Sequence, residues 1–138
     1  MASQLRVDKI VPVDGVPSGG GGGIVQVKSV SKTDTFSSNS TSYTDVTGLS
    51  VSITPKFSTS KILVMMHVQI GHDSNVAGFL RLMRDSTAIA VATDTSNRIA
   101  STVAMADDPT DDEINSTSMT FLDSPSTTSS TTYIFEEI

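Results

Sequence analysis

The chain has 138 residues and a mass of 14.5 kDa, a length that fits one folded domain. It contains no cysteine, which excludes disulfide bridges, cysteine-based zinc sites and thiolate catalysis. The net charge is −6, and residues 99–138 carry eight acidic and no basic residues, so we expect no nucleic-acid partner. The longest run of aliphatic and Met residues, 62–66, is too short to cross a bilayer, so we expect no membrane segment.

Residues 1–17 have the pattern of an extended N-terminal arm, because Pro12 and Pro17 are incompatible with a helix interior. The residues of this arm that we expect to contact a partner are Leu5, Val7, Ile10, Val11 and Val13. A lone strand buries too little surface to be stable, so we expect these residues to bind a partner protein by adding to the edge of its sheet. Residues 18–23, a serine and five glycines, are expected to be a flexible linker.

Residues 24–138 have the composition and the periodicity of an all-β domain. Serine and threonine supply 40 of the 138 residues of the chain, and charged residues only 17%, whereas helical proteins are usually solubilised by Lys, Glu and Arg. Short apolar segments alternate with clusters of turn-forming residues. We therefore expect an antiparallel β-sandwich or jelly roll, with the arm 1–17 extending from it.

The alternation of apolar and polar residues predicts the individual strands in chain order. The expected strands are 25–30, 49–53, 61–70, 79–83, 87–91, 98–105, 116–122 and 133–135, with a hairpin turn at 84–86. Strand 61–70 has the clearest pattern, because its even-numbered residues are all aliphatic or Met from 62 onward. Its other face begins with Leu63 and Met65 and ends with His67 and Gln69, so we expect its first half to be buried on both sides.

The C-terminal strand holds three adjacent large apolar residues, Tyr133, Ile134 and Phe135, and Ile138 follows them. Neighbouring side chains of a strand point to opposite faces of the sheet, so these three cannot all enter one core. An exposed apolar patch is a liability unless a partner covers it. We therefore expect Tyr133, Ile134, Phe135 and Ile138 to form the interface of a homo-oligomer.

Several segments resemble a widespread group of small structural proteins of tailed phages, particularly marine and cyanobacterial phages. They are residues 27–55 (ending TDVTGLSVSITP), 60–70 (SKILVMMHVQI), 78–87 (GFLRLMRDST) and 120–133 (beginning TFLDSP), and the opening MASQLRVDKI before a Gly-rich break is similar too. The resemblance implies a tail-fibre, capsid-fibre or decoration protein that folds as a β-sandwich and is commonly trimeric. Members of the group usually continue beyond the segment matching 131–135, so we expect a neighbouring subunit or the arm to complete the sheet.

From this resemblance and the arm we expect a non-enzymatic virion protein that is joined to capsid or tail proteins through residues 1–17. The alternative is a host receptor-binding or glycan-binding module on the virion surface. Sugar binding usually relies on aromatic platforms, and the chain has only two Tyr and no Trp. The architectural role is therefore the preferred hypothesis.

Carboxylates gather in one loop, and their oxygens are the ligands that Ca²⁺ prefers. They belong to Asp107, Asp108, Asp111, Asp112 and Glu113. Their spacing lacks the D-x-D-x-D-G order of an EF-hand and its distant bidentate Glu. We therefore expect a solvated loop and no cofactor, with Ca²⁺ binding as the open alternative.

We expect the remaining candidate polar residues to have ordinary surface roles and not to act in catalysis. His67 and His72 are the only histidines, and a straight strand would separate their Cα atoms by about 15 Å, too far for one metal ion. The alternative is a metal site formed where copies of one histidine meet on the symmetry axis of an oligomer.

The chain has no G-x-S-x-G motif, and we expect no enzymatic activity. Arg81 and Arg84 lie near Asp85 and are expected to form surface ion pairs or, alternatively, pairs between subunits.

Overall fold

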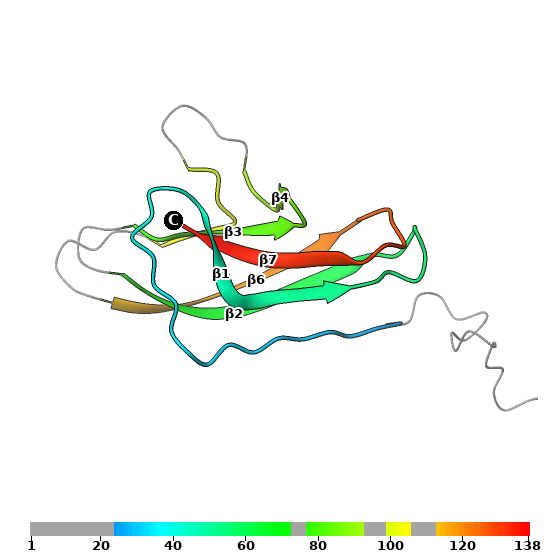
Figure 1. Ribbon diagram of the computed structural model, residues 1–138, viewed down its shortest axis with the longest axis horizontal. Coiled ribbons are helices and arrows are strands. Elements are labelled where there is room, and N and C mark those ends of the chain that lie inside the picture. The colour runs from blue at the N-terminus through cyan, green and yellow to red at the C-terminus, as the bar shows by residue number, and fades with distance from the viewer. Residues whose placement is uncertain (1–23, 73–76, 93–98, 106–112) are drawn as a thin grey trace, which may run out of the picture.

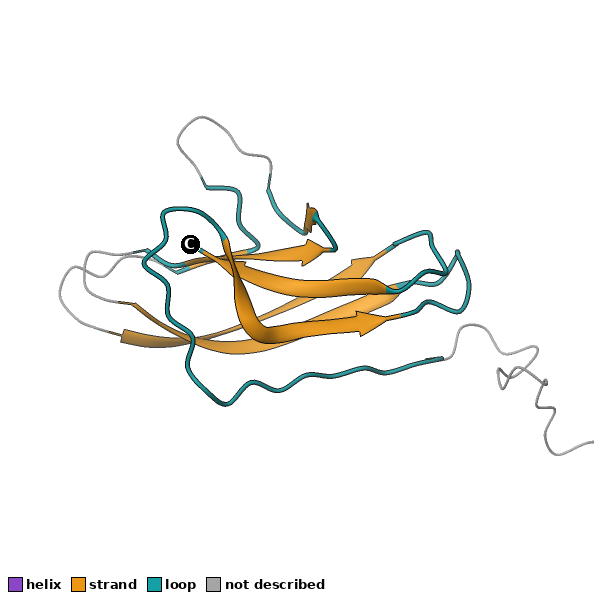
Figure 2. Ribbon diagram, viewed as in Figure 1, coloured by secondary structure: helices purple, strands orange, loops and turns teal. Residues whose placement is uncertain are grey.

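The computed structural model describes residues 24–72, 77–92, 99–105 and 113–138 (Figure 1). The arm 1–17 with its five predicted partner-binding residues, the linker 18–23 and residues 107–112 of the acidic loop lie outside the described residues. The described part is all-β, with antiparallel sheets and no helix (Figure 2). It accordingly holds no helix that is long and apolar enough to span a membrane.

The described residues form seven strands: β1 Thr44–Ile53, β2 Ile62–His72, β3 Phe79–Arg84, β4 Thr87–Ile89, β5 Val103–Ala104, β6 Glu113–Asp123 and β7 Thr131–Glu137. One sheet, here called the large sheet, has the order β1-β7-β3-β4, and β5 also pairs with β3. The small sheet consists of β2 and β6, which pair along their whole length without a register shift. All of these pairings are antiparallel.

The two sheets share one hydrophobic core, and Figure 1 shows β2 and β6 lying alongside the large sheet. Its buried members are Val46 of β1, Met66 and Ile70 of β2, Leu80 and Leu82 of β3, and Tyr133 and Phe135 of β7. Leu82 has no exposed surface, and burying a leucine side chain contributes roughly 1.5–3 kcal/mol. The predicted core face of strand 61–70 is confirmed, since Ile62, Val64 and Val68 pack against the same cluster.

Most of the predicted strands are confirmed, and β1, β2, β6 and β7 extend beyond the predicted bounds. The segment predicted as 87–91 is shorter, and in the described part of 98–105 only Val103–Ala104 forms a strand. The turn at 84–86 is confirmed: Asp85 has φ 51°, and its side-chain Oδ1 accepts a hydrogen bond from the Thr132 amide at 2.9 Å. Asp is among the residues that tolerate this left-handed conformation most readily.

The prediction of a strand over 25–30 is wrong for the single chain. None of the described residues pairs with this segment, and a strand requires the hydrogen bonds of a neighbour. The alternating valines indicate an apolar segment, but the local pattern does not specify which surface covers this segment.

Strand β1 contains a large irregularity in its pairing with β7. Its pairing with β7 jumps from Asp45 opposite Glu136 to Ser50 opposite Ile134, so the residues between them leave the ladder. Gly48 lies in this bulge with φ 85°, a conformation that glycine adopts without steric cost. Val46 and Leu49, on either side of Gly48, pack against the core.

Candidate interaction surfaces

Residues 24–30, here called the exposed segment, carry large aliphatic side chains that the other described residues leave about half exposed or more. The exposed fractions are 87% for Ile24, 51% for Val25, 75% for Val27 and 43% for Val30. The backbone hydrogen bonds of the described part of the chain do not involve this segment. Figure 1 shows it as a drawn-out stretch that runs below β1 and β2 in this view. Both its backbone and its apolar side chains are therefore available to a partner.

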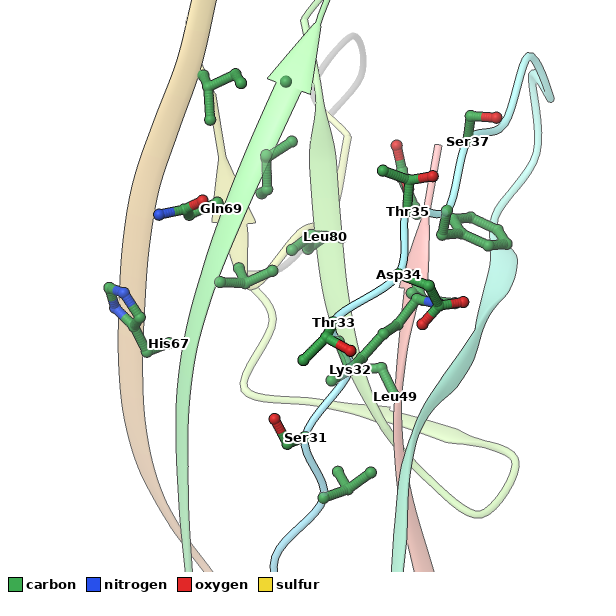
Figure 3. Close-up of a pocket in the computed structure, with 18 residues that line it drawn as sticks. Ser31, Lys32, Thr33, Asp34, Thr35, Ser37, Leu49, His67, Gln69 and Leu80 are labelled. Carbon is green, nitrogen blue, oxygen red and sulfur yellow. The ribbon is translucent and has the colours of Figure 1, made fainter.

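A groove of about 710 Å³ opens between residues 30–37 and the 67–71 stretch of β2 (Figure 3). The side chains of Val46, Leu49 and Leu80 line it from the large sheet. All three belong to the core cluster or pack against it, so the groove reaches the edge of the core. In Figure 3, His67 and Gln69 lie on the side of β2 that faces away from residues 31–37. From the small sheet, residues 67–71 of β2 and Ile114 of β6, which is paired with Gly71, line the groove.

The charged groups that line the groove are nearly balanced. Lys32 forms an ion pair of 2.9 Å with Asp34, and the hydrogen bond from Lys32 lowers the pKa of Asp34. Glu137 is half-buried, and this burial raises the pKa of its carboxyl group. Among the described residues, no cation forms an ion pair with Glu137. The groove thus has a mixed polar and apolar lining, with one carboxylate that forms no ion pair with a described cation.

The outer face of the small sheet carries an exposed apolar patch at one end. Leu63 lies directly opposite Leu122, with Met65 two residues further along β2, and these side chains are 56%, 59% and 73% exposed. The prediction that the first half of this strand is buried on both sides is therefore wrong for the single chain. The reason is that none of the described segments packs on the outer face of the small sheet.

A buried polar network fixes the two sheets against each other. Arg84 Nη1 donates to Oδ1 and Oδ2 of Asp123, at 2.8 and 3.1 Å, and Asp123 is 5% exposed. The Tyr133 hydroxyl donates to the same carboxylate at 2.7 Å. Burial raises the pKa of Asp123, but the hydrogen bonds from Tyr133 and Arg84 outweigh burial and leave it below its usual value.

A second ion pair lies on the outer face of the large sheet. Arg81 Nε donates to Glu136 Oε2, and the guanidinium of Arg81 lies 4.0 Å from the centroid of the Tyr43 ring. The hydroxyl of Tyr43 donates to the Ala100 carbonyl at 2.9 Å. Both arginines thus form half-buried pairs within one chain, and these pairs replace the exposed or inter-subunit pairs expected from the sequence.

The structure separates the four C-terminal residues predicted to form an interface. Tyr133 and Phe135 are 3% and 6% exposed and belong to the core, so their side chains are covered by their own chain. Ile134 lies opposite Met83 of β3 and is half-buried, as is Ile138. Ile138 also exchanges two backbone hydrogen bonds with Phe79. Only Ile134 and Ile138 therefore keep surface to offer to a partner.

The predicted ligand residues are dispersed or undescribed. His67 is exposed on the outer face of the small sheet, and the backbone of His72 ends β2, opposite Glu113. Within the described ranges, three or more His, Asp or Glu side chains do not gather in a way that could hold a metal ion. Asp107, Asp108, Asp111 and Asp112 lie outside these ranges.

Sequence reasoning missed the groove, because its walls come from β2 and from residues 30–37, which are far apart in the chain. The detectable signal was the valine pattern at 25–30, which marks an apolar segment in need of a partner. Comparisons with protein-family models, curated proteins and solved structures find no match.

Proposed function

We propose that this chain is a non-enzymatic structural protein of a tailed-phage virion, a fibre or decoration component. In this proposal, residues 24–138 form a β-sandwich and residues 1–17 attach it to a capsid or tail protein. The chain assembles as a homo-oligomer, with a trimer as the expected state. The phage group that the sequence resembles supplies the virion assignment and the trimer.

The observation that carries the proposal is the uncovered aliphatic surface of the single chain. It is present on the exposed segment 24–30 and on the outer face of the small sheet around Leu63 and Met65. Contiguous apolar patches on soluble monomers are usually small, and larger ones mark interaction sites. A protein that functions inside an assembly has partners to cover such surfaces.

The sandwich proposal is supported by the packing of the sheets. Side chains from β2 on one sheet and from β1, β3 and β7 on the other meet in a single core. In sandwich proteins, two sheets pack face to face through their inward side chains in this way.

The alternative, a glycan-binding or receptor-binding module, has weaker support. The groove is lined by one aromatic residue, Phe36, which packs against the core. A stacking platform for a sugar ring requires an exposed aromatic face. We therefore keep the architectural role as the proposal.

Attachment to phage particles that lack the protein provides the test. The full chain should bind such particles, and a chain without residues 1–17 should not, although the far-UV circular dichroism spectra of both should indicate the same β-fold. A matched control replaces residues 1–17 by a Gly/Ser segment of equal length. Binding of the truncated chain at the full-length level would contradict attachment through the arm, and failure of the full chain to bind any particle would contradict the virion role.

A further inference from the structure

The groove beside β2 and the exposed segment are complementary surfaces of the same chain. We propose that residues 24–30 of one copy bind in the groove of a neighbouring copy, as an added strand beside residues 67–71 of β2. This inference rests on the homo-oligomer proposed above and identifies the contact that forms it.

The backbone of β2 is suited to receive a strand. The small sheet has two strands in the described part of the chain, so one edge of β2 is paired with β6 and the other is open. Residues 67–71 of β2 line the groove. An open edge presents unpaired amide and carbonyl groups, which an extended segment satisfies by β-augmentation.

The exposed segment supplies the matching backbone and side chains. Seven extended residues span about 23 Å, enough to follow the five residues of β2, which span about 16 Å. In an extended segment, Val25 and Val27 project to one side and Gln26 and Lys28 to the other. Docked beside β2, the two valines would meet apolar side chains of the groove such as Val68 and Ile70, and the two polar residues would face solvent.

The charges agree with this docking. The segment IVQVKSV contains one charged residue, Lys28, and the groove contains one uncompensated carboxylate, that of Glu137. The segment and the groove therefore carry net charges of opposite sign, although Lys28 projects to the solvent side of the docked segment. The opposite signs therefore favour this segment over an acidic one.

The position of the segment favours a second copy as its acceptor. Val30 lines the groove of its own chain, and residues 31–37 form the wall opposite β2, whereas residues 24–29 do not line the groove. The segment could fill its own groove only if the chain reversed direction at Val30. When each copy both donates a segment and accepts one, the contact is head-to-tail and can close into a ring.

Cross-linking of two single-cysteine chains tests the contact directly, because the native chain has no cysteine. One chain carries Gln26→Cys and the other Gln69→Cys, each with a distinct tag, and the mixture is treated with a short bifunctional maleimide. We expect a cross-linked product that contains both tags. The matched control, Ser50→Cys, places a cysteine at an exposed position of β1 on the large sheet and should not cross-link to Gln26→Cys.

A second variant, Val25→Asp with Val27→Asp, tests whether the contact holds the oligomer together. Both side chains are at least half exposed in the single chain, so the far-UV circular dichroism spectrum should not change. We expect the oligomer seen by light scattering to be lost. An unchanged oligomer, a wild-type protein that is monomeric at every concentration, or equal cross-linking to the Ser50→Cys control would each overturn the inference.

Two further outcomes separate this inference from competing explanations. Cross-linking of Gln69→Cys to Val7→Cys in place of Gln26→Cys would assign the groove to the N-terminal arm and overturn the inference. Attachment of wild-type protein to phage particles is scored separately. Attachment without cross-linking overturns only the strand exchange, whereas cross-linking without attachment supports the exchange and contradicts only the virion role.

Discussion

Tyr133 of β7 and Asp123 of β6 are joined by a hydrogen bond of 2.7 Å that links the large sheet to the small sheet. Arg84 of β3 binds the same carboxylate through both of its oxygens. Asp123 is therefore a buried charge with a cation and a phenol as partners. Removal of either partner leaves part of its desolvation uncompensated.

Tyr133→Phe should lower the free energy of unfolding by about 1–3 kcal/mol, because the lost hydrogen bond is made to a charged, buried acceptor. Tyr43→Phe is the matched control, since its hydroxyl donates to the neutral Ala100 carbonyl in a less buried position. Its cost should be about 0.5–1.5 kcal/mol. Urea unfolding at pH 7 measures both variants. An equal or smaller loss for Tyr133→Phe would contradict the role assigned to this network.

The Asp123 network should make stability depend on pH in the acid range. The pKa of Asp123 lies below its usual value, so the ionised carboxylate stabilises the fold above the unfolded pKa of about 3.9. This contribution is lost as the pH falls through the folded-state pKa. Asp123→Asn should be less stable than wild type at pH 7 but should lose less stability between pH 5 and pH 2. Parallel loss in both proteins, measured by urea unfolding, would contradict this prediction.

Glu137 should have the opposite effect on how stability depends on pH. Burial raises the pKa of its carboxyl group, so in the single chain the fold favours the protonated form. The stability contributed by the protonated carboxyl group is present below its pKa in the unfolded state and is lost as the pH rises through its pKa in the folded state. Glu137→Gln should therefore stabilise the monomer at pH 7, with the difference vanishing toward pH 3. A destabilised variant in dilute, monomeric protein would refute this expectation.

Leu82 and Leu63 should respond very differently to truncation. Leu82 has no exposed surface, and Leu82→Ala should cost about 2–5 kcal/mol through lost burial and the cavity that remains. Leu63 is 56% exposed on the outer face of the small sheet, and Leu63→Ala should cost less than about 1 kcal/mol in the monomer. Thermal and urea unfolding of the two variants provide the comparison. A large cost for Leu63→Ala in monomeric protein would show that its face is already covered.

Gly48→Ala tests the bulge of β1. The φ of 85° at Gly48 is unfavourable for a residue with a Cβ, so we expect a loss of about 1–2 kcal/mol. Gly78→Ala is the control, because Gly78 has no positive φ and its added Cβ would lie 3.7 Å from Ile70 Cγ2, an ordinary contact. Its effect should stay within about 1 kcal/mol. Equal effects on the unfolding midpoint would argue against strain at Gly48.

Much of the fold followed from local patterns. The alternation in β2 identified its core face, and the turn residues around Asp85 placed the hairpin between β3 and β4. Both signals are local, because side chains of a strand alternate between faces and few residues tolerate a positive φ. The groove and the Asp123 network were not predictable in this way, since each joins residues that are distant in the chain.

By itself, the sequence determined an all-β chain whose strands have one apolar face, because composition and two-residue periodicity act within each segment. Only the tertiary structure decided which apolar residues are covered. It placed β7 between β1 and β3 and buried Tyr133 and Phe135 in the core, where the pattern had suggested an interface, and it left Leu63 and the valines of 24–30 about half exposed or more. The physical reason is that burial depends on which strands lie side by side, and strand order is a property of the whole chain.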